Sequence, residues 1–400
     1  MNRFFQNNTV LHEKSGGTWL ELFFDLVYVA ILVELGQRLA GNLTMVGVLE
    51  FAAMFVLIWW SWLSLVFYTR YFPSDDIGQR ILTAVYMFAM ILLAFEIHNV
   101  TAQTITYFLV AYAATKFILA MMYGRAWYEF PEYRALTSHY AIFNVAIGLL
   151  WLSIAMFATE NLWLWVAAAL IDIFIPLLIR ASHQIRKEPQ PTHPPLKHHY
   201  MRHRFGELTI IVLGEFFIKL IASSSGIEQT PFNFYLGACL LAISLSIWWL
   251  YFDHTDHAHL GRDSANPFVW IYSHYFLLAA ITAYGVVGTK IFAAVPQEVL
   301  SQDKRVLFSV ALAIAMLALG VIDWASPEEN DRLSRRPHFN IRMGAALLML
   351  LLAGLGSLIN VGWFVTLVAL VLIGQVAFDI RIRLRNKEGV ETAVQHERPS

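Results

Sequence analysis

Pairs of charged residues stand four positions apart inside strongly apolar stretches of this sequence. Glu21 and Asp25 form one pair, and Glu215 and Lys219 form another. Because residues i and i+4 share a helical face, each pair would act on one side of a helix. A carboxylate followed by a lysine can neutralise itself within its own helix, whereas two carboxylates cannot. We therefore expect Glu21 and Asp25 to need a cation, a proton or a basic group elsewhere, such as Lys116.

Three further ionisable residues stand isolated in apolar stretches, namely Lys116, Asp172 and His274. A charged side chain near the centre of a bilayer costs about 2.5–3.5 kcal/mol on insertion scales unless it is paired or faces water. Lys116 and Asp172 therefore need partners on other helices, and the imidazole of His274 can titrate near neutral pH. The alternative for each of these charges is a buried pair that only holds helices in register.

Candidate metal ligands are concentrated in the sequence YFDHTDHAH at 251–259. Asp253 and His257 would share a helical face if the helix continues that far, with His254 beside them, and this spacing can bind a divalent metal. The chain has no HExxH or EF-hand motif, which favours a solvated turn instead. A divalent metal is the one cofactor that the sequence leaves open.

The elements that must position these residues are membrane-spanning helices. Hydrophobic residues make up 58% of the 400 and charged residues only 14%, a composition that excludes a water-soluble fold. Runs of about 20 apolar residues predict an all-α integral membrane protein with twelve spans. Their approximate ranges are 19–40, 45–68, 81–98, 103–123, 138–158, 161–180, 206–223, 232–252, 268–292, 305–323, 341–359 and 361–379.

The basic residues predict how these spans are oriented. Most of the 28 Lys and Arg residues fall in segments on one side of the twelve-span arrangement, as the positive-inside rule requires of the cytoplasmic side. We therefore expect a multi-pass protein of the inner (plasma) membrane with cytoplasmic N- and C-termini. The formal net charge of -1 excludes nucleic-acid binding as the main function.

Similar strings in the two halves of the chain predict an internal repeat. LIWWSW at 57–62 resembles SIWWLY at 246–251, and ATENLWLWV at 158–166 resembles SLINVGWFV at 357–365. Since each half has an even number of spans, the two six-helix repeats would be parallel. The predicted parts are a cytoplasmic N-terminal segment (1–18), a first membrane half (19–180), a cytoplasmic linker (181–205), a second membrane half (206–380) and a cytoplasmic tail (381–400), disordered after Arg385.

Five polar residues fall toward the predicted cytoplasmic ends of corresponding spans in the two halves. They are Glu21, Asp25, Glu207, Asp253 and His274. We expect these residues to line a polar chamber that opens inward at the interface of the repeats.

Four segments resemble successive signatures of the bacterial low temperature requirement protein A family. They are WLELFFDLVYVAIL (19–32), RFGELTIIVLGE (204–215), IWWLYFD (247–253) and YSHYFLLAAI (272–281). The resemblance extends to about residue 380, and it implies a membrane protein without naming a substrate. Phe216 stands where that family usually has a serine.

These observations favour a transporter or channel for a small solute or ion, with its polar path between the two repeats. The predicted path residues are Glu21, Asp25, Lys116, Asp172, Glu207, Glu215, Lys219 and His274. A metal- or cofactor-dependent intramembrane enzyme and a non-catalytic, cold-responsive membrane protein are the alternatives, and we favour a protein that is not an enzyme. The expected partners are the lipid bilayer and a small solute or ion, with a homo-oligomer left open.

Overall fold

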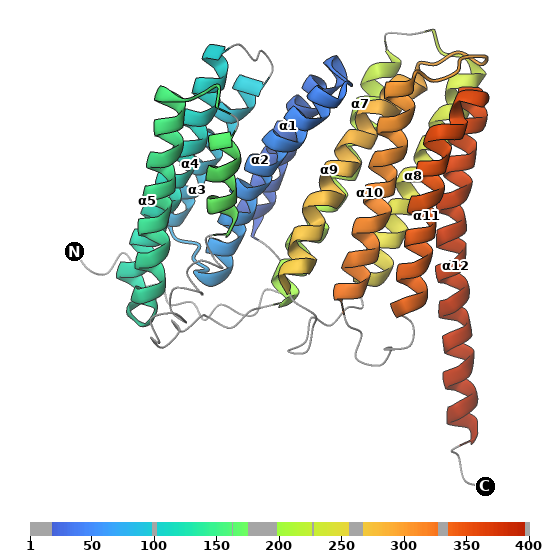
Figure 1. Ribbon diagram of the computed structural model, residues 1–400. Coiled ribbons are helices and arrows are strands. Elements are labelled where there is room, and N and C mark those ends of the chain that lie inside the picture. The colour runs from blue at the N-terminus through green and yellow to red at the C-terminus, as the bar shows by residue number, and fades with distance from the viewer. Residues whose placement is uncertain are drawn as a thin grey trace. The chain divides into compact units, whose positions relative to one another are not determined.

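The computed structural model describes residues 18–97, 102–161, 163–174, 198–225, 228–255, 267–326 and 335–396. Every regular element within these ranges is a helix (Figure 1). Nine of the helices described are long and apolar enough to cross a membrane. The prediction of an all-α membrane protein is therefore confirmed.

Three of the twelve predicted spans correspond to helices outside this set of nine. They are α1 (Trp19–Gly41), α7 (His198–Ser224) and the short helix Trp163–Phe174. The first two carry several charges, and the third is described only over residues 163–174. These three helices hold Asp25, Asp172 and Glu215, the acids for which the sequence predicts a role.

The chain divides into two compact units, Met1–Leu208 and Thr209–Ser400, with the boundary inside α7. After α1, the first unit contains α2 (Met45–Tyr71), α3 (Ile77–Ile97), α4 (Ala102–Glu129), the short η1 (Pro131–Tyr133) and α5 (Arg134–Phe157). Helix α4 packs against both α3 and α5, while α1 packs against α2 and α3. The aromatic side chains of Trp59, Trp62, Tyr86, Tyr112 and Trp151 are buried.

The second unit contains α8 (Pro231–Thr255), α9 (Pro267–Phe292), α10 (Gln302–Ala325), α11 (Arg335–Leu355), the short η2 (Gly356–Leu358) and α12 (Val361–His396). Helix α10 packs against both α9 and α11, and α12 packs against α8 and α11. In each predicted half, then, the fourth of the six spans (α4 or α10) packs against the third and the fifth. The parallel repeat itself stays a prediction.

Two helices extend into the predicted cytoplasmic linker and tail. Helix α7 begins at His198, so the last residues of the predicted linker 181–205 are helical. This start buries Met201, Arg204 and Phe205, and the segment after Pro195 contains no helix-breaking proline. Helix α12 continues to His396 through the tail that the sequence analysis expects to be disordered after Arg385, and it extends past α10 and α11 in Figure 1. No proline interrupts that stretch before Pro399.

Candidate functional site

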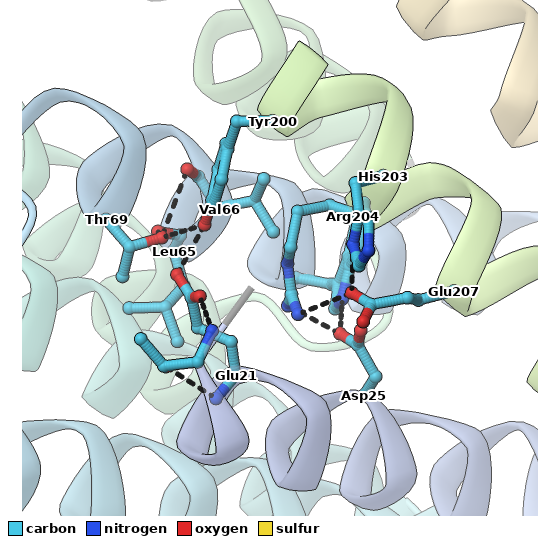
Figure 2. Close-up of polar contacts among 11 residues, drawn as sticks. Glu21, Asp25, Leu65, Val66, Thr69, Tyr200, His203, Arg204 and Glu207 are labelled. Carbon is cyan, nitrogen blue, oxygen red and sulfur yellow. Dashed lines mark hydrogen bonds and ion pairs between the residues drawn. The ribbon is translucent and has the colours of Figure 1, made fainter. Parts of the chain in front are cut away.

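The buried carboxylate of Asp25 on α1 is paired with Arg204 from the first turns of α7. The Nη2 atom of Arg204 donates to Oδ1 of Asp25 at 2.7 Å (Figure 2). The Nε1 atom of Trp62 donates to the same oxygen at 2.7 Å. Asp25 and Arg204 are both fully buried. The sequence-based suggestion that Lys116 neutralises this face is wrong, because Arg204 occupies that position.

Glu21, one turn before Asp25, links three helices. One of its carboxylate oxygens accepts the Thr18 N–H at 2.7 Å, and Thr18 accepts the Glu21 N–H in return, which caps the start of α1. Its other oxygen accepts the hydroxyl of Tyr200 on α7, which lies 2.9 Å from the Thr69 hydroxyl on α2 (Figure 2). The Glu21 side chain is thereby held at the same end of α1 as Asp25.

Glu207 adds a third carboxylate beside Arg204. Its Oε2 atom lies 3.5 Å from Nη1 of Arg204 and 3.2 Å from Nδ1 of His203. We call this group, which brings together three predicted path residues, the Asp25 cluster. Its members are Glu21, Asp25, Tyr200, His203, Arg204 and Glu207.

Three atoms of the Asp25 cluster are buried without a hydrogen bond among the residues that the structure describes. They are Oδ2 of Asp25, Nδ1 of His203 and Nε of Arg204. A buried polar atom that lacks a partner carries the full penalty of leaving water. The Asp25 cluster is therefore an incompletely satisfied polar site inside an apolar unit.

A second buried ion pair joins the short helix Trp163–Phe174 to α4. The Nζ atom of Lys116 lies 3.0 and 2.8 Å from the two oxygens of Asp172, and both side chains are 1% exposed. Asp172 also accepts the Nε1–H of Trp60 at 2.8 Å and the hydroxyl of Tyr112 at 2.6 Å. Lys116 and Asp172 thus have the partners on other helices that the sequence analysis requires. We call Trp60, Tyr112, Lys116 and Asp172 the Asp172 cluster.

A small cavity of about 30 Å³ lies beside Asp172. Its polar lining includes Ser64, Tyr123, Tyr140 and Asn144. A cavity of this size has room for about one or two water molecules, and no organic solute would fit.

In the second unit, Glu215 and Lys219 form an ion pair along α7, as their spacing predicts. His274 on α9 has both ring nitrogens engaged: Nδ1 donates to the Trp270 carbonyl at 2.7 Å, and Nε2 lies 3.0 Å from the Tyr251 hydroxyl. The carbonyl can only accept, so Nδ1 carries a proton. These two contacts fix the orientation of the ring.

Phe216, which replaces the serine usual in the resembled family, fits against two glycines of α9. A Cβ atom built on Gly288 would lie 2.8 Å from Cε2 of Phe216, and one on Gly285 would lie 3.4 Å from its Cδ2. The ring also packs on Tyr284, with centroids 5.0 Å apart. An apolar contact therefore takes the place of a hydroxyl, so no polar role falls to this position.

Of the three proposed metal ligands, only Asp253 has a described side chain. Asp253 pairs with the guanidinium of Arg383 on α12. The His254 side chain and His257 lie outside the described residues. Within those residues, no group of three or more His, Cys, Asp or Glu side chains could hold a metal ion.

A further buried charge cluster in the second unit was not predicted from the sequence. Arg342 on α11 lies 2.6 Å from Oδ2 of Asp379 on α12 and 3.5 Å from Oδ2 of Asp323 on α10, and His338 lies 3.1 Å from Asp379. These residues stand at the ends of predicted spans, where charges are usually solvated. The spacing of His338 and Arg342, four apart on one helical face, is the signal that could have found them.

Of the five residues predicted to line one chamber, Glu21, Asp25 and Glu207 share a cluster in the first unit. Asp253 and His274 belong to the second unit, where each has its own partner, Arg383 and Tyr251. A chamber between the halves stays a prediction that neither unit supports by itself.

Many long apolar helices, with pairs of charged side chains buried between them, define a multi-pass integral membrane protein. The chain belongs to the bacterial low temperature requirement A protein (LtrA) family, whose profile matches residues 17–377. It is also 23% identical over 342 residues to an uncharacterized protein of Rhizobium meliloti (strain 1021), a match that covers 81% of this chain and 79% of that protein. The resemblance found in the four sequence motifs is confirmed.

Proposed function

We propose that this protein is a transporter for a small solute or ion and that the Asp25 cluster forms part of its path. The observation that carries the proposal is the unpaired Oδ2 atom of the fully buried Asp25. A carboxylate that only clamps helices together is most stabilising when donors reach both of its oxygens. A transport site, by contrast, must keep an atom available for a ligand that binds and leaves.

In this proposal all twelve helices lie in the inner (plasma) membrane as two parallel six-helix repeats with cytoplasmic termini. The unequal distribution of Lys and Arg supports the orientation. Burial of the charged side chains of Asp25, Arg204 and Asp172 against neighbouring helices supports placing α1, the start of α7 and the short helix Trp163–Phe174 inside the bundle. The Asp25 cluster then lies toward the cytoplasmic leaflet.

Flux measurements on purified protein in liposomes test the proposal. We expect the protein to move an ion or small solute from a broad panel, and Asp25→Asn to abolish that movement. The control is Glu50→Gln, which breaks the partly exposed Arg38–Glu50 pair (2.6 Å) away from the cluster and should leave flux unchanged. Absence of flux across the panel, or equal flux in Asp25→Asn, would contradict transport. An effect of Asp25→Asn on stability alone would favour the non-catalytic alternative.

A further inference from the structure

The Asp25 cluster contains more negative than positive charge. The carboxylates of Asp25 and Glu207 lie 2.7 and 3.5 Å from the single guanidinium of Arg204, and the third carboxylate, that of Glu21, accepts the Tyr200 hydroxyl. The charged groups that act on Asp25 are Glu21, Glu207 and Arg204. Helix α2 contributes the uncharged Trp62. Because Arg204 is shared between Asp25 and Glu207, the fully buried Asp25 has no counter-charge of its own. An ionised carboxylate is costly in such a position unless positive charge balances it.

We propose that the missing positive charge is a proton and that it binds at Oδ2 of Asp25. The proposal rests on the transport function above and gives that transporter its coupling ion. Trp62 and Arg204 both donate to Oδ1, which leaves Oδ2 buried and without a donor. A proton on Oδ2 removes the charge of the carboxylate and leaves both hydrogen bonds to Oδ1 in place.

A metal cation fits this position less well than a proton. Hard cations such as Ca²⁺ take six to eight oxygen ligands, and Mg²⁺ demands near-octahedral coordination. The described residues contain no group of acidic or histidine side chains arranged to supply such a set. Arg204, moreover, already occupies the space beside Asp25 with a fixed positive charge.

The exposure of the cluster decreases along a line that a proton could follow. The His203 side chain is 38% exposed and that of Glu207 is 22% exposed, whereas that of Asp25 is 0% exposed. His203 contacts Glu207, and Glu207 contacts the same guanidinium that holds Asp25 (Figure 2). His203 and Glu207 therefore take the proton from water, and Asp25 is where it ends.

Protonation would change the contact between two helices. A hydrogen bond from arginine to an ionised carboxylate is about twice as strong as one between neutral groups. A proton on Asp25 removes the ion pair with Arg204 and so weakens the link from α1 to the start of α7. Proton binding would thereby be coupled to the movement of these two helices.

Infrared difference spectroscopy of the purified full-length protein during a pH titration tests the site without requiring transport. We expect the C=O band of a protonated buried carboxyl group to appear as the pH is lowered, to be lost in Asp25→Asn, and to shift in Asp25→Glu, which keeps the carboxyl group. Glu50→Gln should retain the band. Its persistence in Asp25→Asn, or its absence from the folded wild-type protein at every pH, would overturn the proposal.

Flux measured with and without a pH gradient separates the two proposals. If a solute moves at a rate that ignores the gradient, the proton proposal fails and the transport function stands. If the band depends on Asp25 but nothing moves, the transport function fails and the proton site stands. Glu207→Gln should slow proton uptake while the Asp25 band remains, and an unchanged rate would exclude Glu207 from the entry path.

Discussion

The Asp25 cluster and the Asp172 cluster begin from the same components in one unit of the molecule. Each has a fully buried aspartate that is paired with a buried base and accepts a tryptophan N–H. Asp172 has one counter-charge for one charge, and donors reach both of its oxygens. Asp25 has acidic neighbours and one oxygen without a donor. Burial of a charge therefore does not by itself indicate function. A buried carboxylate whose oxygens all have donors acts as a helix clamp, whereas one with an oxygen that lacks a donor is a candidate site.

The strongest test of this comparison removes the base of the complete pair. Lys116→Met leaves Asp172 buried without its counter-charge, and breaking a buried pair in this way costs about 3–5 kcal/mol. We expect a loss of that size in the free energy of unfolding, measured by denaturation in detergent. Lys116→Met combined with Asp172→Leu should recover most of the loss. A neutral result for Lys116→Met would show that the Asp172 cluster is not a clamp.

A smaller effect is expected when the two aspartates are changed in the same way. Asp172→Asn leaves Lys116 as an uncompensated buried cation, whereas Asp25→Asn leaves Arg204 beside Glu21 and Glu207. We expect Asp25→Asn to cost about 1.5–3 kcal/mol, the range for a hydrogen bond to a charged group, and Asp172→Asn to cost more. Parallel denaturation curves measure the difference. Equal losses would remove the distinction between the two clusters.

An apolar contact in the second unit gives a loss of stability with which the losses at both clusters can be compared. Gly288→Ala would place a methyl group against the ring of Phe216, and overpacking of this kind costs about 1–3 kcal/mol. The matched control is Gly344→Ala, since nothing lies within 4 Å of a Cβ at that position. The cost of Gly288→Ala should largely disappear in a Phe216→Ala background. If it persists there, the clash is not with Phe216.

The smallest effect is expected at Asp76, whose ion pair with Arg125 is the solvent-accessible counterpart of Asp25–Arg204. Burial alone would raise the pKa of Asp76, but hydrogen bonds from Ser74, Arg125 and the Gln79 N–H, with the charge of Arg125, lower it to about 2. A lowered pKa stabilises the fold above the unfolded value of 3.8, and that stability is lost as pH falls toward about 2.

Because the Asp76 side chain is 38% exposed, solvent screening reduces the contribution of this pair to below about 1 kcal/mol. Asp76→Asn should therefore flatten the pH dependence of unfolding slightly between about pH 4 and pH 2. A larger change than Asp25→Asn produces would contradict the ranking by burial.

Local spacing was enough to predict some contacts but not others. Glu215 and Lys219 are four residues apart, about one helical turn, so their pairing can be predicted from the sequence of their own helix. The partner of Asp25 is 179 positions away, in a segment whose prolines and histidines predict a linker. The composition of an isolated segment cannot reveal that residues 198–205 become helical when they pack on α1 and α2.

The same reasoning explains the difference between twelve predicted spans and nine strongly apolar helices. Hydropathy identifies a helix that carries few charges, whereas α1 and α7 carry charges that other helices cover. Arg342 and Asp379 were overlooked for the converse reason: they lie at span ends, where solvation is the usual fate of a charge. Their burial depends on how three helices meet, and no single segment contains that information.

The fit of Phe216 between Gly285 and Gly288 restricts the order in which this sequence could have changed. With a phenylalanine at 216, a Cβ at position 288 would lie 2.8 Å from the ring, whereas a serine at 216 leaves room for a Cβ. We therefore expect relatives with the serine to vary more at the position of Gly288 than relatives with an aromatic residue. The two sites should change together across the family, and the less costly order is a glycine at 288 before an aromatic residue at 216.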